Sequence, residues 1–574
     1  MRKESLHYLI SILLGCLLLS LPWLLPHSGW TALLGFVPLL VMERLAQARG
    51  TRRFFWWYYL FFVLWNAITT WWVGMATVGG AVFAIAANAF QMALIFGAFR
   101  LVKRRLKGAL PYIFLAAAWI AWEKFYLTSA QISWPWLVLG NAFADTTGLV
   151  QWYEFTGSLG GSLWIWAANL SVFGLMCSLS DGSFSRRGIK ARSAAISGVV
   201  LAFFGPMIVS AFVQVPREEG ETLNVAILQP NLDPYMKEQS LTTAQQDQII
   251  LSQLVQACSQ RDTSAPLLVL GPETMTRDSG IWLEQGSGYE AYHYSFPSYE
   301  DYRSTVAAQQ GVSLVFGAVV RSYHRNGERN NGYRIADMWL YHHNAALLVD
   351  GSSAPLGERV HIRRFADTEA DIPPFLAQAQ EFRDVKLPDS YYKSKLVPGV
   401  EMMPYPKVIG PINRLVGDPC GKDVGEGAPA CLPLRLPDGR EIPLGVAVCY
   451  ESVYGEHCAG YVAKGAQLLC VITNDAWWGT TPGYRQHLNM SRLRAIETRR
   501  YVARCGNTGI SGVIDPEGRI LSRSAWWHRE VLDSEVKLLQ GETFFVRAGD
   551  IVGRLSVFVF LLLVAAALIS RFRK

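Results

Sequence analysis

The chain has 574 residues, of which 51% are apolar, 12% aromatic and 17% charged, and its mean hydropathy is +0.17. Ordinary soluble proteins carry about 25% charged residues, so this composition excludes intrinsic disorder, a collagen-like repeat and a small disulfide scaffold. The net charge of +7 divides unevenly, because residues 215–545 carry a net charge of −7 and the remainder carries +14.

Eight apolar windows predict membrane-spanning helices, since a helix needs about 20 residues to cross the hydrocarbon core. In chain order they are residues 7–25, 30–43, 56–74, 79–98, 109–123, 159–178, 194–214 and 550–570. The first window follows Arg2 and Lys3 as in a signal peptide, but no small-residue cleavage site follows it, so we count it as a span. We therefore expect residues 1–214 to form a membrane domain of seven helices, and residues 546–574 an eighth helix with a cytoplasmic tail.

Clusters of Lys and Arg predict the topology, because cytoplasmic loops are rich in both. Such clusters lie at the N-terminus, after the second, fourth and sixth windows, and at the C-terminus. If the N-terminus is cytoplasmic, all of them face the cytoplasm, and only Lys124, Arg547 and Arg554 remain elsewhere among the 21 basic residues of the membrane part. Topology therefore explains the basic charge without nucleic-acid binding. We expect a multi-pass protein of the cytoplasmic (inner) membrane with residues 215–545 on the periplasmic side.

The segment from Thr128 to Gly161 joins two of these windows and is too long for a simple turn. It contains Trp134 and Trp136, and tryptophan prefers the membrane–water interface. We expect an interfacial loop or a re-entrant segment on the side of the large domain.

The pattern changes in residues 215–545, where short β-branched runs alternate with helix-like stretches. The predicted strands are Asn224–Leu228, Leu267–Leu270, Ser313–Val319, Met338–Leu348, Leu444–Val448 and Leu468–Ile472. The predicted helices are Thr242–Ser259, Tyr299–Gln310, Gly455–Lys464 and Gln486–Cys505. This alternation predicts an α/β domain with strands buried between helices.

Cysteine and histidine spacing argues against a metal site, because the sequence has no CxxC pair and no HExxH motif. Neither a GxGxxG nor a Walker lysine motif is present, so we expect no nucleotide or other cofactor. Cys420 and Cys431 lie in a Gly/Pro-rich loop of the exported domain, where they either form a disulfide or remain two thiols that never approach.

Three sites with chemically capable residues stand out in this domain, each placed at the end of a predicted strand. They are Glu273 after Leu267–Leu270, Lys393 with Glu401 eight residues later, and Cys449 after Leu444–Val448. Together they could supply a nucleophile, a general base and a cation for an oxyanion. Each also has a plainer interpretation: a small buried thiol, a capping carboxylate and a solvated lysine.

The motifs around these residues resemble those of the nitrilase superfamily of carbon–nitrogen hydrolases, and more closely its membrane family of apolipoprotein N-acyltransferases. The resemblance covers most of the chain, including the eight-span arrangement around an external domain. It rests on SWPWL at 133–137, PET at 272–274, YYKSKLVP at 391–398, CYES at 449–452, NDAWWG at 474–479, QHLNMSRLRAIE at 486–497 and NTGISGVIDPEGR at 507–519.

The resemblance implies an αββα sandwich over residues 215–545 and an acyl transfer through a cysteine thioester. By position, Glu273 would be the general base and acid, Lys393 the oxyanion partner and Cys449 the nucleophile. The donor would be a membrane phospholipid, and the acceptor the N-terminal amine of a diacylglyceryl apolipoprotein. We also expect a monomer. Supporting roles would fall to Glu401, Tyr450 and Glu451, and the substrate pocket would include Trp477, Asn474 and Tyr235.

Two other functions fit parts of the pattern. One is a membrane-tethered amidase or hydrolase of the nitrilase type, which would use water as the acceptor. The other is a membrane protein whose external domain only binds a ligand. The aromatic stretch from Trp282 to Tyr302 is interpreted either as a lid at the membrane surface or as a packed loop.

Overall fold

The computed structural model describes residues 3–213, 215, 220–233, 241–259, 265–275, 280–283, 289–294, 297–324, 332–335, 338–353, 361–364, 389–415, 417 and 419–572. The chain divides into two compact units. The first, here the helical unit, comprises Met1–Pro216, Thr480–Arg499 and Glu542–Lys574. The second, here the sheet unit, comprises Arg217–Gly479 and Arg500–Gly541.

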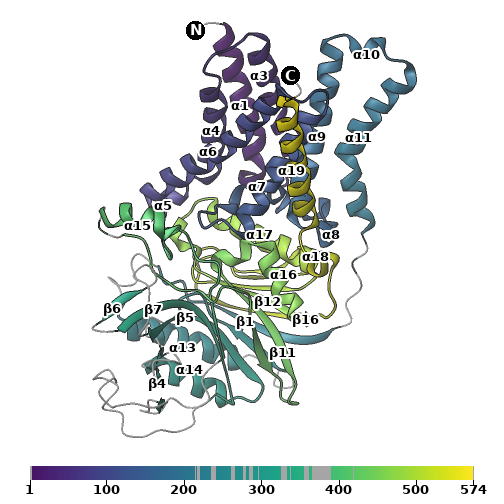
Figure 1. Cartoon of the computed structure of the whole chain (residues 1–574). Helices are drawn as coiled ribbons and strands as arrows, with labels where there is room; N and C mark the ends of the chain where they lie inside the picture. Colours follow the sequence, from purple (N-terminus) through teal and green to yellow (C-terminus); the bar gives the residue numbers. More distant parts are fainter. Residues whose placement is uncertain are drawn as a thin grey trace. The chain divides into compact units, whose positions relative to one another are not determined.

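The long helices of the helical unit coincide with the predicted spans (Figure 1). They are α1 (Lys3–Leu24), α3 (Val37–Ala48), α4 (Phe55–Thr70), α6 (Val78–Lys103), α7 (Leu110–Thr128), α9 (Ser158–Ser180), α11 (Ile189–Phe212) and α19 (Ile551–Phe572). In the described part of the chain, six helical segments are long and apolar enough to cross a membrane, and α4 and α7 account for the other two predicted spans. The predicted polytopic helical domain of about eight spans is therefore confirmed.

The second predicted span is divided into two helices, and a side chain from another helix forms hydrogen bonds with the backbone at the division. The short α2 (Ala32–Gly35) precedes α3, and Pro38 lies in the first turn of α3. The Asn169 carboxamide in α9 accepts hydrogen bonds from the backbone N–H groups of Phe36 and Val37, at 2.7 and 3.1 Å. It also donates to the carbonyl of Ala32 at 2.9 Å. Backbone groups in a membrane need such internal partners, because lipid offers none.

Helix α11 packs mainly against α9 and stands apart from the other long helices (Figure 1). Pro206 inside α11 has no N–H, so the carbonyl of Ala202 lacks its helical partner. The indole N–H of Trp164 in α9 donates to that carbonyl at 2.9 Å, which joins the two helices at the point where α11 lacks a backbone hydrogen bond.

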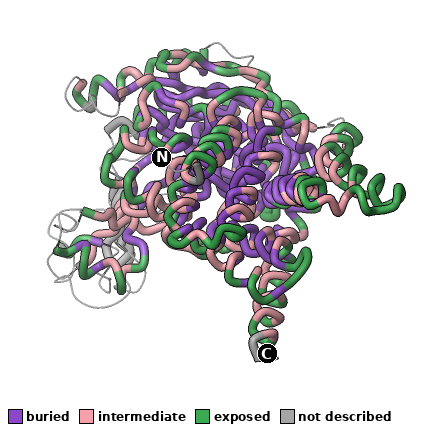
Figure 2. The backbone as a smooth tube through the Cα atoms, turned by 90° about the horizontal axis from the view of Figure 1, so that it is seen from above, coloured by how far each residue is buried: buried purple, intermediate pink, exposed green. Residues whose placement is uncertain are grey.

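Exposed and intermediate positions predominate along α19 towards the C-terminus (Figure 2).

The segment between α7 and α9 consists of short turns that are largely buried within the helical unit. These are η2 (Pro135–Leu137), η3 (Leu139–Phe143), η4 (Thr147–Leu149) and α8 (Tyr153–Thr156). Trp136 is almost fully buried, and its carbonyl accepts a hydrogen bond from the indole of Trp23 at 3.2 Å.

Helix α17 (Gly483–Thr498) belongs to the helical unit, although it lies in sequence between two strands of the sheet unit. The buried Gln486 carboxamide accepts hydrogen bonds from the indoles of Trp72 and Trp136, and donates to the carbonyls of Trp23 and Thr69. Both the oxygen and the nitrogen of this buried carboxamide therefore have hydrogen-bond partners, as buried polar groups require.

The predicted helix over Gln486–Cys505 is wrong at its C-terminal end. Arg499 adopts a left-handed backbone with φ of 49°, which ends α17 at Thr498. The following Val502–Gly506 forms strand β13, whose five residues are all buried. Its β-branched and small residues satisfy either pattern, so only pairing with a neighbouring strand decides between them.

The sheet unit contains two sheets. In the described part of the chain, one has ten strands and the other six. The ten-stranded sheet has the order β16-β1-β2-β5-β3-β4-β8, with β7 joining β5 to β6 and β9. The six-stranded sheet runs β10 to β15 in order. The strands are β1 (Glu221–Gln229), β2 (Leu267–Leu270), β3 (Gly280–Leu283), β4 (Tyr289–Tyr294), β5 (Val312–His324), β6 (Tyr333–Ile335), β7 (Met338–Asp350), β8 (His361–Arg364), β9 (Asp389–Tyr392), β10 (Cys431–Arg435), β11 (Glu441–Val448), β12 (Leu468–Thr473), β13 (Val502–Gly506), β14 (Gly512–Ile514), β15 (Ile520–Arg523) and β16 (Glu530–Leu538).

Helices cover the outer faces of both sheets, which confirms the αββα sandwich. Helices α13 (Thr243–Ser259) and α14 (Pro297–Ala307) lie side by side against β1 and β5 (Figure 1). Helix α16 (Gly455–Ala463) packs on β11 of the other sheet. Between the sheets, the buried Cys505 thiol donates to the carbonyls of Leu228 and Leu270, at 3.1 and 3.4 Å.

Two further sequence expectations concern loops of this unit. Cys420 and Cys431 are not joined by a disulfide, so the first alternative does not hold in this structure. In the aromatic stretch from Trp282 to Tyr302, residues 284–288 and 295–296 lie outside the described residues.

Candidate active site

Glu273 follows β2, on a turn that lies against β5. The next residue, Thr274, has a left-handed backbone with φ of 47°. A Cβ atom at Gly317 would approach the backbone of Glu273 and Thr274 to within 2.5–2.8 Å, so only glycine permits this contact. The backbone N–H of Gly317 donates to the Pro272 carbonyl at 3.0 Å, and that of Met275 donates to the Gly317 carbonyl at 2.8 Å. The turn thereby holds Glu273 in a buried position.

Lys393 follows β9, which pairs with β7 so that Ala345 lies opposite Tyr392. The backbone N–H of Lys393 donates to the carbonyl of Asn344 at 2.8 Å. This register places the Asn344 side chain beside the lysine, although 49 residues separate them in the sequence.

Cys449 is the first residue after β11 and begins the short 3-10 turn η6 (Cys449–Val453). Its backbone is left-handed, with φ of 52°. A side chain at such a position costs of order 1–3 kcal/mol and persists only where the surroundings enforce it. One enforcing contact is the Glu451 carboxylate, which accepts a hydrogen bond from the N–H of Val448 at 2.8 Å.

The predicted acidic and basic residues meet in one buried cluster. The Lys393 ammonium lies 3.1 Å from Oε1 of Glu273 and 2.8 Å from Oε1 of Glu401. The Asn344 amide donates to the same two carboxylate oxygens, at 2.8 and 3.0 Å. The second oxygen of Glu401 accepts from the N–H of Val397 at 2.7 Å. Both carboxylates are therefore held in place by a cation and an amide together.

The electrostatics of the cluster define its resting protonation state. Burial alone would lower the pKa of Lys393, but the charges of Glu273 and Glu401 outweigh it and hold that pKa well above its usual range. Burial raises the pKa of the Cys449 thiol, as does the neighbouring Glu273, whereas Lys393 lowers it. The resting site thus holds a protonated lysine and a neutral thiol, and the thiol must lose its proton during attack.

Glu451 connects the cysteine turn to the lysine loop. Its Oε1 accepts from the N–H of Ser394 at 2.6 Å and from the hydroxyl of Tyr391 at 2.7 Å, and lies 3.1 Å from Nε2 of His457. Burial would raise the pKa of this carboxyl, but His457 and the other donors hold it below its usual range. A fully buried carboxylate therefore joins the segments that carry Lys393 and Cys449.

A second polar chain extends from Cys449 into the six-stranded sheet. The Cys449 side chain is within hydrogen-bonding range of Thr473, whose hydroxyl donates to Asp475 at 3.0 Å. Asp475 pairs with Arg504 at 2.6 Å, and both side chains are buried. Roles for Thr473, Asp475, Arg504 and Asn344 were not predicted from the sequence. For the first two, the signal was available as polar residues at the end of strand β12.

The remaining predicted residues differ in their surroundings. Asn474 is buried and accepts a hydrogen bond from Asn507 at 3.3 Å, so its amide supports a loop. Trp477 is 42% exposed, in the turn η7 (Asp475–Trp478). Tyr450 is buried, with its ring 5.3 Å from that of Tyr454. Tyr235 lies outside the described residues. Among the residues that are described, no group of three His, Cys, Asp or Glu side chains could hold a metal ion.

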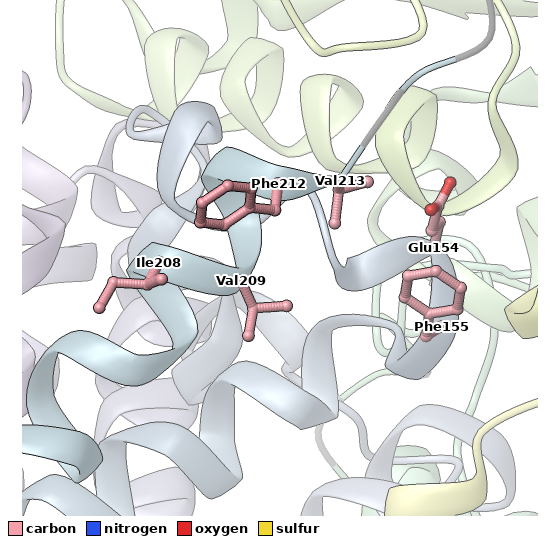
Figure 3. A pocket seen from close by; sticks show the side chains of 6 residues that line it. All are labelled: Glu154, Phe155, Ile208, Val209, Phe212 and Val213. Atoms are coloured by element: carbon pink, nitrogen blue, oxygen red, sulfur yellow. The ribbon is translucent and has the colours of Figure 1, made fainter.

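Two apolar cavities lie in the helical unit and contain none of these residues. One, of about 520 Å³, is lined by Phe155 of α8 and by Ile208, Val209, Phe212 and Val213 at the end of α11, together with the carboxylate of Glu154 (Figure 3). The other, of about 540 Å³, lies between α9 and α11 and is lined largely by Trp152, Phe155, Leu163, Trp164 and Val209.

Comparisons with known proteins match both parts of the chain. Residues 15–171 match the family model for the apolipoprotein N-acyltransferase N-terminal domain. Residues 306–542 match the model for carbon-nitrogen hydrolase, a stretch that includes Lys393 and Cys449 but begins after Glu273.

Individual relatives match over different lengths. The apolipoprotein N-acyltransferase of Chlorobaculum tepidum is 26% identical over 563 residues, which is 96% of this chain and 94% of the relative. That of Thermotoga maritima is 36% identical over 199 residues, 35% of this chain and 37% of the relative. Among solved structures, Saccharomyces cerevisiae Nit3, a member of branch 10 of the nitrilase superfamily, aligns with a TM-score of 0.34 and 15% identity, covering 58% of this chain and 95% of Nit3.

Proposed function

Because the chain belongs to the apolipoprotein N-acyltransferase family of the nitrilase superfamily, we propose that it acylates the N-terminal amine of lipoproteins. The donor is a membrane phospholipid, and the acceptor is the α-amino group of a diacylglyceryl-cysteine. The acyl chain passes through a thioester on Cys449.

The observation that carries this proposal is the buried cluster of Glu273, Lys393 and Glu401 beside the left-handed turn of Cys449. A neutral thiol needs a base at the moment of attack. The Glu273 carboxylate lies close enough to the thiol for its charge to raise the pKa of Cys449, and it can therefore serve as that base. A fixed cation suits the negative oxygen that develops on the ester carbonyl, and Lys393 supplies one.

The first half-reaction acylates the enzyme. The Cys449 sulfur attacks the ester carbonyl of the phospholipid, its proton passes to Glu273, and the tetrahedral oxyanion is stabilised by Lys393. Collapse breaks the ester C–O bond, and the departing lysophospholipid oxygen takes the proton back from Glu273. Glu401 and Asn344 hold Lys393 and Glu273 in position throughout.

The second half-reaction transfers the acyl chain. The acceptor amine attacks the thioester carbonyl, Glu273 removes a proton from the nitrogen, and the thiolate leaves and is reprotonated. Amide formation must outcompete hydrolysis, so the site must exclude water while the thioester persists. We assign Trp477, Asn474 and Tyr235 to the substrate pocket, with Trp477 on its lipid-facing side.

The location of the reaction follows from the topology. We assign residues 215–545 as the periplasmic catalytic domain, residues 1–214 as seven spans and residues 546–574 as the eighth span with its tail. The five basic clusters on one side of the cytoplasmic membrane support this orientation. The enzyme then meets both lipid substrates in the outer leaflet of that membrane, and we expect it to act as a monomer.

A pre-acylation chase tests the function. The purified protein is charged with acyl-labelled phospholipid, the donor is removed, and a diacylglyceryl peptide is added. We expect label on Cys449 before the acceptor is added, and label on the peptide amine afterwards, because one pocket serves two large substrates in turn. Transfer only while donor is present would indicate a ternary mechanism. Label released as free fatty acid as fast as it reaches the peptide would support a membrane-tethered hydrolase, and no label on the protein would support a binding function alone.

A further inference from the structure

Helix α15 (Pro406–Leu415) carries an apolar stripe on its exposed face. Val408 is 70% exposed, Ile412 60% and Leu415 86%. With Tyr405 just before the helix, these residues follow one another at intervals of three or four, which places them on one side of a helix. Gly410 and Asn413 are the buried residues of the helix, on its opposite side. Exposure of this extent at successive apolar positions indicates a face that is covered in the working protein.

The charge of this helix identifies what covers it. Residues 402–417 contain two basic residues, Lys407 and Arg414, and no acidic residue. An amphipathic helix with basic residues beside its apolar face binds in the plane of a lipid–water interface, where the cations meet anionic headgroups. The sheet unit is joined in sequence to a spanning helix at each end, α11 and α19, so a bilayer is always within reach.

Two backbone hydrogen bonds join residues 399–401, just before α15, to residues 421–423, after it; this paired segment, here called the neck, lies between α15 and the catalytic cluster. The N–H of Asp423 donates to the carbonyl of Glu401 at 2.8 Å, and the N–H of Gly421 donates to that of Gly399 at 3.3 Å. A Cβ atom at Gly421 would lie 2.1 Å from the carbonyl oxygen of Val400, so the two sides of the neck are in direct contact. The helix is therefore the tip of a closed loop whose base holds the carboxylate that pairs with Lys393.

We propose that α15 docks on the lipid bilayer by the face bearing Tyr405, Val408, Ile412 and Leu415, and that this contact brings the catalytic cluster to the surface from which it draws its phospholipid. The docking itself does not depend on the reaction, whereas its effect on substrate use rests on the function proposed above. Docking lowers the KM for phospholipid in a bilayer and leaves the chemistry at Cys449 unchanged.

Photocrosslinking tests the docking directly. A benzophenone amino acid is incorporated in place of Ile412 in the full chain, which is then placed in nanodiscs of phosphatidylethanolamine and phosphatidylglycerol and irradiated. We expect a phospholipid adduct on the peptide containing position 412. The control position is Asp438, in an exposed turn of the same unit, where we expect no adduct. Absence of an adduct at 412, equal labelling at 438, or crosslinking of 412 to a second protein chain in place of lipid would overturn the proposal.

A substrate comparison tests the effect on activity. In Ile412→Glu combined with Leu415→Glu, we expect the KM for nanodisc phospholipid to rise at least about tenfold, because two charges replace the inserted side chains. Cys449 acylation by a water-soluble short-chain ester should keep its rate. The control Val255→Glu replaces an exposed apolar residue of α13 and should change neither. An unchanged KM, or equal losses with both substrates, contradicts the proposal. If the wild type forms no thioester with either substrate, the acyltransferase function fails, and the crosslink still decides the docking.

Discussion

Lys393 is the residue on which the charges of the site depend. Its ammonium is almost fully buried, and burial opposes its charge, yet two carboxylates within 3.1 Å keep it protonated. Those carboxylates in turn lie close together only because the ammonium and the Asn344 amide lie between them. Removal of the lysine would leave two buried carboxylates without a counter-charge, which is costly in a low-dielectric site.

Glu273→Gln and Lys393→Met should each abolish detectable thioester formation. Loss of a general base costs about 10²–10⁴ in rate, and loss of an oxyanion-stabilising group about 10²–10³. The measurement is the intact mass of the protein after incubation with phospholipid. Lys395→Met is the matched control, because the Lys395 ammonium lies 5.2 Å from the Tyr454 ring and outside the ion cluster. Near-normal thioester in either site variant would show that its assigned role is wrong.

Asp423 should make the stability of the protein depend on pH near neutrality. Burial, and then the charge of Glu401, raise the pKa of this carboxyl from 3.8 to about 7. Between these two values the folded state holds a proton that the unfolded state has lost, so this group makes stability fall as the pH rises from about 4 to about 7. Asp423→Asn should flatten that dependence and raise the melting temperature above pH 7.

Thermal unfolding of the full-length protein in detergent, measured across this pH range, checks the difference between variant and wild type. The exposed Asp438 offers the control, since its pKa is lowered by the N–H and guanidinium of Arg440, and Asp438→Asn should leave the slope unchanged over that range. Parallel curves for wild type and Asp423→Asn would contradict the assignment.

At the scale of elements, Glu451 shows how separate segments are held in register around the nucleophile. It lies in η6, yet it accepts hydrogen bonds from the last residue of β11 and from the loop that follows β9. The left-handed turn at Cys449 and the position of Lys393 therefore depend on one fully buried carboxylate. The Glu451 side chain thereby links β11 of the six-stranded sheet to the loop after β9 of the ten-stranded sheet.

Glu451→Gln should destabilise the protein and slow acylation. An amide NH₂ would face at least one backbone N–H donor, and each buried donor left without a partner costs about 1–3 kcal/mol. Thermal unfolding and the rate of thioester formation measure the two effects. The control is Glu441→Gln in the preceding strand β11, where an exposed ion pair with Arg435 is worth roughly 0–1 kcal/mol. If both variants behave alike, Glu451 does not hold the turn.

On the scale of the whole molecule, the helical unit recruits a segment from the middle of the sheet unit's sequence. Residues 480–499 leave the six-stranded sheet after β12 and return to it at β13. The four hydrogen bonds of Gln486 and the pairing of Arg492 with Asp145 at 2.9 Å hold this segment within the helical unit. Neither unit is therefore one continuous stretch of chain.

Reporter fusions should establish the orientation of both units in the membrane. Fusions after Arg52, Arg105, Arg187 and Lys574 should report the cytoplasm, because each follows a basic cluster. Fusions within residues 215–545 should report the opposite side. Termini on opposite sides would mean an odd number of spans, and that result would overturn the eight-span topology.

The sequence by itself determined the features that depend on local composition. Apolar windows marked the spans, because length and hydropathy are enough for a helix in lipid. Basic clusters predicted the orientation in the same way. The order of Glu273, Lys393 and Cys449 and the motifs around them singled out these residues, although apolar runs revealed only the strands before Glu273 and Cys449.

Only the tertiary structure decided which residues complete the site and which unit each segment joins. Asn344 reaches Lys393 through the pairing of β7 with β9, and Arg504 reaches Asp475 through the pairing of β12 with β13. Both depend on strand register, which is set by the burial of whole faces and leaves no local trace. The same holds for the end of α17. The sequence Val502–Gly506 is compatible with helix or strand, and its hydrogen bonds to β12 decide that it is a strand. The partner of a residue across a sheet is set by the packing of the whole fold, so local sequence patterns do not reveal it.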